Sequence, residues 1–432
     1  MSDIINFKCP ACGAPISYKG ESAGLTCDYC NSTFDMEQVK AAEAAEKISA
    51  ESSDMTWTEP TQDLIRDENG KMEGFLCPSC GAEIIADESL GATECPYCGN
   101  KAVVPHAFDG MYRPDVMIPF KLNKERAQAA LKNFYKGKKL LPNGFADGNR
   151  MKEIQGVYVP FWLMSCEAEG DASFEGVNTE TRESGNKRYT KEKHYLAHRH
   201  GKMQFNRIPA DGSKAMDDEY MDGLEPFDYK DLVEYDDAYF SGYLANRYDV
   251  SAEEVQERIN VRVENSVVSE LERTVKGYDS VNHKDHTVRF NSDKIEYAMF
   301  PVWMLTTKFQ DVKYSFAMNG QTGKISGKLP VDMGKYWKYL LLTSLICFLV
   351  AQALIAIFGG SDGFSLLVEL VVLLVSGFIG FGYASGLKKA MSTAETAMEA
   401  GTYLDTGSVK IMQKSDTFMF EKHWEEDIKS NK

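Results

Sequence analysis

The chain contains none of the motifs that mark several large enzyme classes, and it has no excess of basic residues. Its 432 residues contain no P-loop, no glycine-rich dinucleotide fingerprint and no H-E-x-x-H motif. Lysine and arginine number 48 against 64 acidic residues, a net charge of −16. A chain this acidic repels a phosphate backbone overall, so nucleic-acid binding would need a locally basic face. We therefore expect a protein that is neither an enzyme nor a general nucleic-acid binder.

Cysteine is plentiful and regularly spaced. Eight of the ten cysteines form two copies of C-x2-C-x14-C-x2-C, offset by 68 residues. This spacing is typical of zinc ribbons, in which four thiolates fill a tetrahedron and leave no position for substrate. We predict two structural Zn²⁺ ions and no catalytic residues. The predicted metal ligands are Cys9, Cys12, Cys27 and Cys30 in the first copy and Cys77, Cys80, Cys95 and Cys98 in the second.

Disulfides and redox C-x-x-C sites are the alternative interpretations of these cysteines. Residues 1–7 are short and polar and do not resemble a signal peptide, so we expect the N-terminus in the reducing cytosol. A redox motif would accompany a βαβ pattern, which is not visible here.

The first ribbon has a net charge of −2, the second −3, and neither contains arginine. Protein docking is therefore favoured over nucleic-acid binding.

The region after the ribbons predicts an α+β domain with an internal duplication. Residues 154–164 (IQGVYVPFWLM) and 295–305 (IEYAMFPVWML) are similar and lie 141 residues apart. A helix is expected before each, over 123–139 and 251–276. An apolar stripe along the second helix indicates a core face, although packing against a second protomer in a homo-oligomer stays open.

Three histidines form the best catalytic or metal-binding alternative in this domain. His194, His198 and His200 would share one face of a strand, but lysines and arginine surround them, which favours a solvated strand face. An acidic run over 217–222 is expected to be a charged loop.

Two long apolar runs near the C-terminus predict a transmembrane hairpin. Residues 339–361 contain no charge, and 364–387 contain only Glu369. Lysines flank the outer ends of both runs, so we expect two spans in the inner (plasma) membrane with both termini cytoplasmic. Glu369 is interpreted as a shallow residue that reaches the interface. The tail is expected to be weakly ordered, with a helix start over 391–401 and two short strands around 409–412 and 418–421.

The predicted architecture is multidomain: two small β zinc ribbons, an α+β domain and a two-helix membrane hairpin. Its predicted parts are zinc ribbon 1 (1–36), a helix and acidic linker (37–73), zinc ribbon 2 (74–106), the duplicated domain (115–330), the hairpin (336–387) and the tail (388–432).

The motifs CPACG, CPSCG and CPYCG, followed by GVYVPFW, FPVWML and NGQTGKISGKLP, resemble those of bacterial TFIIB-type zinc-ribbon membrane proteins. The resemblance implies a membrane-anchored scaffold associated with SPFH-domain (flotillin-like) and phage-shock-protein-A-like partners in envelope stress. This chain departs from the simplest form by having two ribbons, which leaves open which one docks a partner.

The expected function is therefore a non-enzymatic adaptor that docks cytoplasmic proteins at the inner membrane. The alternative is a membrane-tethered nucleic-acid-binding or transcription-associated factor, which a basic face around residues 187–202 would favour. An enzyme hidden in residues 115–330 is the third possibility.

Overall fold

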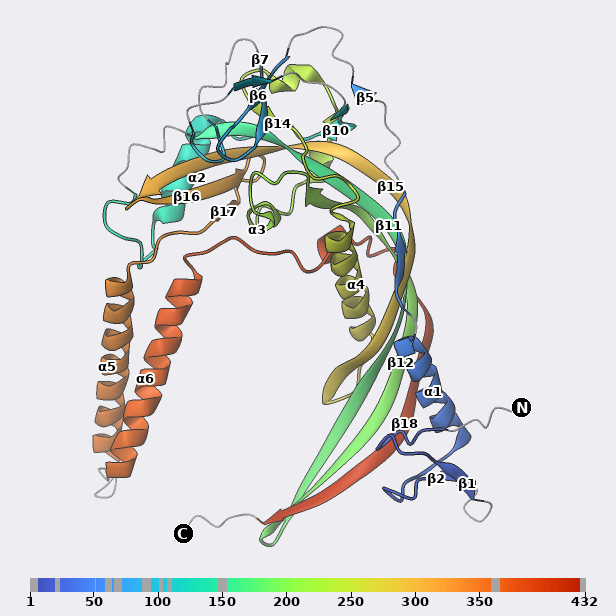
Figure 1. The fold of residues 1–432 in the computed structure, drawn as a ribbon. Helices are drawn as coiled ribbons and strands as arrows, with labels where there is room; N and C mark the ends of the chain where they lie inside the picture. The colour runs from blue at the N-terminus through green and yellow to red at the C-terminus, as the bar shows by residue number, and fades with distance from the viewer. Residues whose placement is uncertain are drawn as a thin grey trace.

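The protein forms an arch, described by a computed structural model (Figure 1). One leg is a helical hairpin and the other is a curved arm of four long strands. The described residues are 7–19, 24–50, 52–58, 64–65, 72–87, 95–100, 104–106, 111–146, 154–358 and 366–427.

Thirteen of the described strands form one mixed sheet, and three others form a small sheet at the first cysteine module. The four arm strands lie in the order β15 (Ser280–Phe309), β11 (Gln155–Ser184), β12 (Lys187–Asp211) and β18 (Lys410–Asp427). The small sheet comprises β1 (Ser17–Lys19), β2 (Gly24–Thr26) and β3 (Thr33–Phe34). Short strands elsewhere are β4 (Asp54–Thr56), β5 (Leu64–Ile65), β6 (Met72–Leu76), β7 (Glu83–Asp87), β8 (Val104–His106), β9 (Met111–Tyr112), β13 (Val233–Glu234) and β17 (Ile325–Gly327).

The long strands have a core face covered by α4 (Gln256–Glu272). The predicted apolar stripe of this helix is buried, since Ile259, Val263 and Val267 are fully inaccessible to solvent. Gly170 on β11 lets the helix approach, because a Cβ there would overlap with Val267 Cγ1. Ser251 and Glu254 exchange the two hydrogen bonds of a capping box, although the regular helix begins one turn later.

The two halves predicted to be related have the same order of elements, and the short first strand of each half pairs with the long strand of the other. The first half runs β10 (Val116–Met117), α2 (Lys124–Tyr135), β11 and β12, and the second runs β14 (Leu244–Asn246), α4, β15 and β16 (Val312–Asn319). Strand β10 pairs in parallel with β15, whereas β14 pairs in parallel with β11. Val159 and Phe300, which lie 141 residues apart in the sequence, are direct partners in the antiparallel β11–β15 ladder. This symmetric exchange agrees with the internal duplication, which stays a prediction.

The other two helices predicted in the N-terminal half are present. Helix α1 (Met36–Ala50) forms at the start of the segment predicted as a helix and linker over 37–73. Asn123 caps α2, since its Oδ1 accepts a hydrogen bond from the Arg126 N–H at 3.0 Å.

Within the predicted acidic linker, residues 54–57 are held on the sheet. Strand β4 pairs in parallel with residues 289–291 of β15. The indole N–H of Trp57 donates to Asn260 Oδ1 on α4 at 2.7 Å, and its side chain is buried. Burial of the indole and pairing of the backbone fix this part of the linker on the sheet.

The expectation of a weakly ordered tail is wrong. Residues 393–400 form an extended strap without helix, whose backbone bonds to the body, for example Glu395 N–H to Glu219 O at 2.9 Å. The two predicted short strands are one 18-residue strand, β18, which pairs along β12 with two bulges. The acidic run is likewise not a loop, since it includes the short helix α3 (Asp218–Asp222).

The hairpin consists of two long apolar helices, α5 (Met333–Phe358) and α6 (Leu366–Lys389), whose outer surfaces are exposed and apolar. They touch closely at Gly380, where a Cβ would lie 2.8 Å from Leu340 O. Glu369 is not isolated: Gln352 Nε2 on α5 donates to its Oε2 at 2.5 Å.

Candidate metal centres and adjoining cleft

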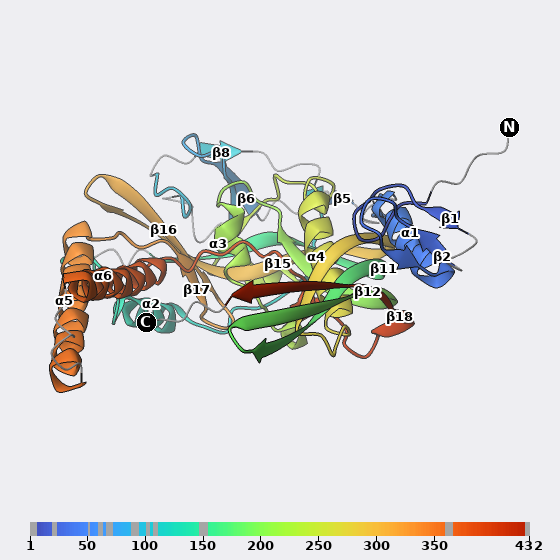
Figure 2. The ribbon, with the colours of Figure 1, turned by 90° about the horizontal axis from the view of Figure 1, so that it is seen from below.

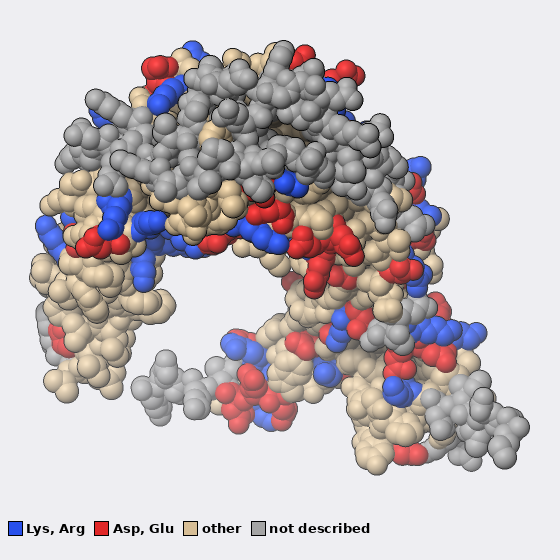
Figure 3. Space-filling view, turned by 45° about the horizontal axis from the view of Figure 1, so that its top comes forward, with Lys and Arg blue, Asp and Glu red and all other residues tan. Residues whose placement is uncertain are grey.

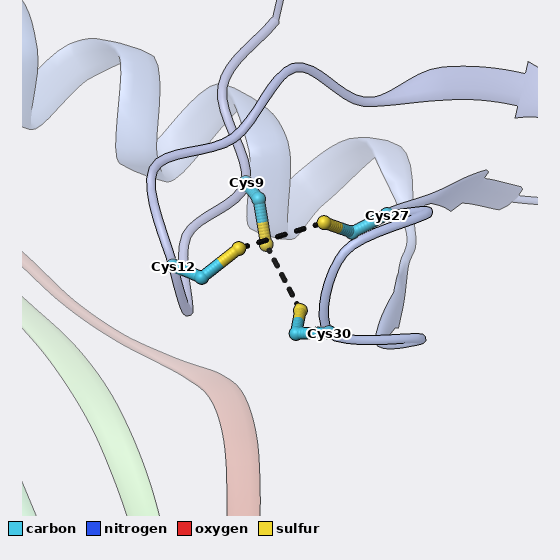
Figure 4. Close-up of side chains that lie close together, drawn as sticks. All are labelled: Cys9, Cys12, Cys27 and Cys30. Atoms are coloured by element: carbon cyan, nitrogen blue, oxygen red, sulfur yellow. Dashed lines mark hydrogen bonds between the residues drawn. The ribbon is translucent and has the colours of Figure 1, made fainter.

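Each set of four predicted ligands converges on one point. Within each set the four sulfur atoms lie within 4.8 Å of one another. Figure 4 shows the first set, in which Cys9 and Cys30 Sγ are 3.5 Å apart, as are Cys12 and Cys27 Sγ. The corresponding distances in the second set are both 3.6 Å.

These distances fit a metal ion at the centre of each set. A tetrahedral ion with metal–sulfur bonds of about 2.3 Å places its ligand sulfurs roughly 3.8 Å apart. The donor set, four thiols and nothing else, is the one that structural zinc prefers. Both sets therefore have a geometry suited to one Zn²⁺ each.

Tight turns aim the cysteines inward. In each pair the first cysteine carbonyl accepts the N–H four residues later, as in Gly13 N–H to Cys9 O at 2.8 Å. The residue after the second cysteine adopts a positive φ, +75° at Gly13 and Gly81. Asn31 fills this position in the last turn of the first module with φ 57°, where the second module has Gly99. Asparagine tolerates this conformation better than most residues, so the turn is kept.

Burial and mutual hydrogen bonding keep some thiols protonated. Burial raises the pKa of Cys9 to about 12, and the hydrogen bond with Cys80 raises that of Cys95 well above its usual value. The same bond lowers the pKa of Cys80 to about 5. A metal ion must displace the remaining protons, which couples metal affinity to pH.

The second module is part of the main body. Cys77 and Cys95 belong to the same core cluster as Phe161 and Phe300 of the central strands. Strand β7 pairs with β14 in the large sheet, and Thr306 Oγ1 on β15 donates to Tyr97 O at 2.8 Å. The described part of this module therefore packs as a brace on the sheet.

The first module lies at the opposite end of the molecule from the hairpin (Figure 2). Gln38 Nε2 on α1 donates to Phe418 O at 2.9 Å and to Met419 O at 3.2 Å on β18. A cleft of about 390 Å³ opens between this module and the arm. Its apolar lining includes Phe7, Val39, Ala42 and Leu196.

Of the three histidines, only His194 lines the cleft. It is 7% exposed, its ring stacks on Phe420, and its Nδ1 lies 3.0 Å from Glu175 Oε1. His198 pairs with Asp171, and His200 Nε2 lies 3.1 Å from Glu169 Oε1. The expectation of a solvated face is thus wrong for His194. The three rings pair with carboxylates along the strand and do not form a three-ligand metal group.

In the region named above as a candidate nucleic-acid face, residues 187–202, the basic side chains are paired with carboxylates. Every lysine and arginine between positions 187 and 202 lies within 3 Å of a carboxylate oxygen. These pairs are Lys187–Glu425, Arg188–Glu183, Lys191–Glu421, Lys193–Glu180, Arg199–Asp416 and Lys202–Glu169. Neighbouring carboxylates leave little free positive potential for a phosphate backbone.

Sequence reasoning missed two buried ion pairs on α4, because their partners are far apart in the chain. Arg262 and Glu225 are bidentate, at 3.0 and 2.6 Å, and the Tyr403 hydroxyl donates to the same carboxylate at 2.8 Å. Arg258 Nη2 lies 2.8 Å from Asp211 Oδ1. Burial raises the pKa of Asp211 to about 7, because desolvation outweighs the attraction of Arg258. The Asp211 Oδ2 atom has no hydrogen-bond partner, which agrees with that direction.

The chain is similar to a known but uncharacterised protein. It is 31% identical over 332 residues to the "Uncharacterized protein YdjG" of Bacillus subtilis, a match that covers 77% of this chain and 92% of the relative. No family model and no solved structure matches the chain.

Proposed function

The chain belongs to the same family as YdjG, and we propose that it is a membrane-anchored, zinc-binding adaptor that docks cytoplasmic protein partners at the inner membrane. The observation that carries the proposal is the cleft between the first cysteine module and the arm. This cleft is walled by both apolar and charged side chains and lies at the end of the molecule away from the hairpin. The proposal is non-enzymatic, with both ions serving structure.

The two modules receive different roles in this proposal. The second braces the central sheet, while the first, with α1, forms one wall of the docking cleft. The TFIIB-type resemblance makes SPFH-domain and phage-shock-protein-A-like proteins the first partners to test. Display at the membrane would raise a partner's local concentration there.

The pairing of β18 with β12 supports the proposed orientation. One strand follows the hairpin in the chain and the other precedes it, yet they form one ladder. Both flanks of the hairpin therefore need to be on one side of the membrane, and the flanking lysines favour the cytoplasm.

A substitution in the cleft tests the docking role. Ala42 on α1 lines the cleft, whereas Ala44 on the same helix is exposed outside it. Ala42→Trp should fill the cleft and abolish recovery of SPFH- or phage-shock-type partners in affinity purification from membranes, and Ala44→Trp should leave recovery unchanged. Zinc content, expected to be two ions per chain, should be the same in both variants.

The same purification distinguishes the alternative function. Nuclease-sensitive DNA or RNA that co-purifies in place of a protein partner would favour the membrane-tethered nucleic-acid-binding factor. Equal partner recovery with both tryptophan variants would show that the cleft does not dock the partner.

A further inference from the structure

We propose that a collar of lysines at the base of the hairpin binds the phosphate groups of anionic phospholipids. The collar combines positions that are distant in sequence. Its members are Lys132, Lys136, Lys138 and Lys139 from α2 and the turn after it, Lys335 and Lys338 from α5, and Lys388 and Lys389 from α6. This inference rests on insertion of the hairpin into a bilayer, which is part of the proposed function.

Direct contacts hold the end of α2 against both helices of the hairpin. Lys138 Nζ donates to Ala390 O, just after α6, at 2.5 Å. Lys335 Nζ donates to Leu141 O at 2.6 Å, and the Asp332 N–H donates to Leu140 O at 2.8 Å. The turn that follows α2 is therefore fixed against the start of α5 and the end of α6.

The collar lies at the depth where headgroups are expected. Lys139 Nζ donates to the Tyr383 hydroxyl at 2.8 Å and lies 5.8 Å from the centre of the Tyr339 ring. Tyr339 begins the uncharged stretch of α5, whose 20 residues to Phe358 span about 30 Å, the thickness of the hydrocarbon layer. Trp337 is 55% exposed at the same end, as expected of an interfacial anchor.

The described part of the chain supplies no carboxylate that pairs with the collar. Among the described residues, none of its eight lysines lies in an ion pair, in contrast to the fully paired cations between 187 and 202 on the arm. The carboxylate of Asp332 accepts the Lys335 backbone N–H at 3.0 Å and so serves as a helix cap. Figure 3 shows basic side chains, with acidic ones beside them, where the hairpin meets the body.

A positive collar on a chain of net charge −16 calls for an external anion. Lipid phosphates are at the required depth, and each lysine near an anionic surface adds to the attraction. Bound lipid would hold α2 on the membrane surface and so fix the tilt of the arch relative to the bilayer.

Lipid retention by the full-length protein tests this inference. The protein is reconstituted in vesicles of equal parts phosphatidylcholine and phosphatidylglycerol, extracted in mild detergent, and its retained lipids are quantified by mass spectrometry. The wild type should retain phosphatidylglycerol in excess. The combined Lys132→Gln, Lys136→Gln and Lys139→Gln variant should lose about tenfold or more of that excess.

The matched control replaces three exposed lysines away from the collar, Lys230→Gln, Lys276→Gln and Lys410→Gln, and should retain lipid as the wild type does. Equal retention by the collar variant, or displacement of the lipid by millimolar inorganic phosphate, overturns the inference. Resistance to alkaline extraction is measured in parallel. Extraction of the wild type by alkali would overturn membrane anchoring itself, whereas partner docking at the cleft does not enter this readout.

Discussion

Asp211 illustrates how a single buried carboxyl group can make stability depend on pH. Its pKa is raised from 3.8 to about 7 in the folded protein. Below about pH 4 both folded and unfolded chains bind the proton, and the folded chain gains the full benefit. That benefit, about 4 kcal/mol, is lost as the pH rises through 7, because the folded chain must then hold a buried charge.

We therefore predict that Asp211→Asn raises the melting temperature relative to wild type by several degrees more at pH 8 than at pH 5. The substituted amide stays neutral at both values, so the variant escapes the cost that the wild type incurs at high pH. Thermal unfolding in detergent, followed by tryptophan fluorescence, measures the difference. Asp218→Asn is the control, since Asp218 also pairs with Arg258 but is 60% exposed. A difference from wild type that does not change with pH would contradict the assignment.

Among the elements, the two cysteine modules differ in how much of the fold depends on them. Cys95 shares a core cluster with the central strands, whereas Cys27 belongs to a small separate cluster with α1. Small metal modules cannot bury enough apolar surface to fold alone. Loss of the metal therefore unfolds the module and destabilises the elements that pack against it.

The prediction is that Cys27→Ser and Cys95→Ser each remove one zinc per chain, while only Cys95→Ser lowers the main melting transition markedly. Metal analysis by mass spectrometry and thermal unfolding of the same samples provide the two measurements. An equal drop in melting temperature for both variants would mean that the first module also supports the body. Unchanged metal content in either would remove that cysteine from the ligand set.

The same elements show what could be predicted from the sequence. Cysteine spacing predicted both four-thiol groups, because each pair is aimed by a local turn whose geometry a few residues determine. Alanine- and glutamate-rich composition predicted α1, and capping residues with an apolar helical face predicted α2 and α4. The integration of the second module into the sheet was missed, since the β7–β14 pairing joins residues far apart in the chain.

Long-range contacts also explain the wrong prediction for the tail. Residues 391–400 have high helix propensity, yet the strap is extended because the body satisfies its backbone groups individually. The Ala397 N–H, for example, donates to Asp222 Oδ2 at 3.0 Å, and the Ala400 N–H to Ser266 Oγ at 2.7 Å. The polar residues 413–417 pair with residues 196–200 of β12, but their composition gives no strand signal, which is why one strand was predicted as two.

At the scale of the whole molecule, the arm constrains how the chain can cross a membrane. Strands β12 and β18 form a continuous ladder, from Lys187 with Asp427 to Lys202 with Lys410. The first of these strands precedes α5 and the second follows α6. An odd number of membrane crossings between them would place the two strands on opposite sides of the membrane, where they could not pair. The pairing thus argues for an even number of crossings, independently of the flanking charge.

This argument predicts the outcome of reporter fusions in a Gram-negative host. Green fluorescent protein fused after Lys432 should fluoresce, since it folds in the cytoplasm, and alkaline phosphatase inserted between Gly359 and Gly360 should be active, since it needs the periplasm. The same phosphatase fused at the C-terminus serves as the control and should be inactive. Active phosphatase at both positions would require a single crossing, which would separate β18 from β12. Loss of the ladder would then also remove the strand that Gln38 contacts, and with it one wall of the proposed docking cleft.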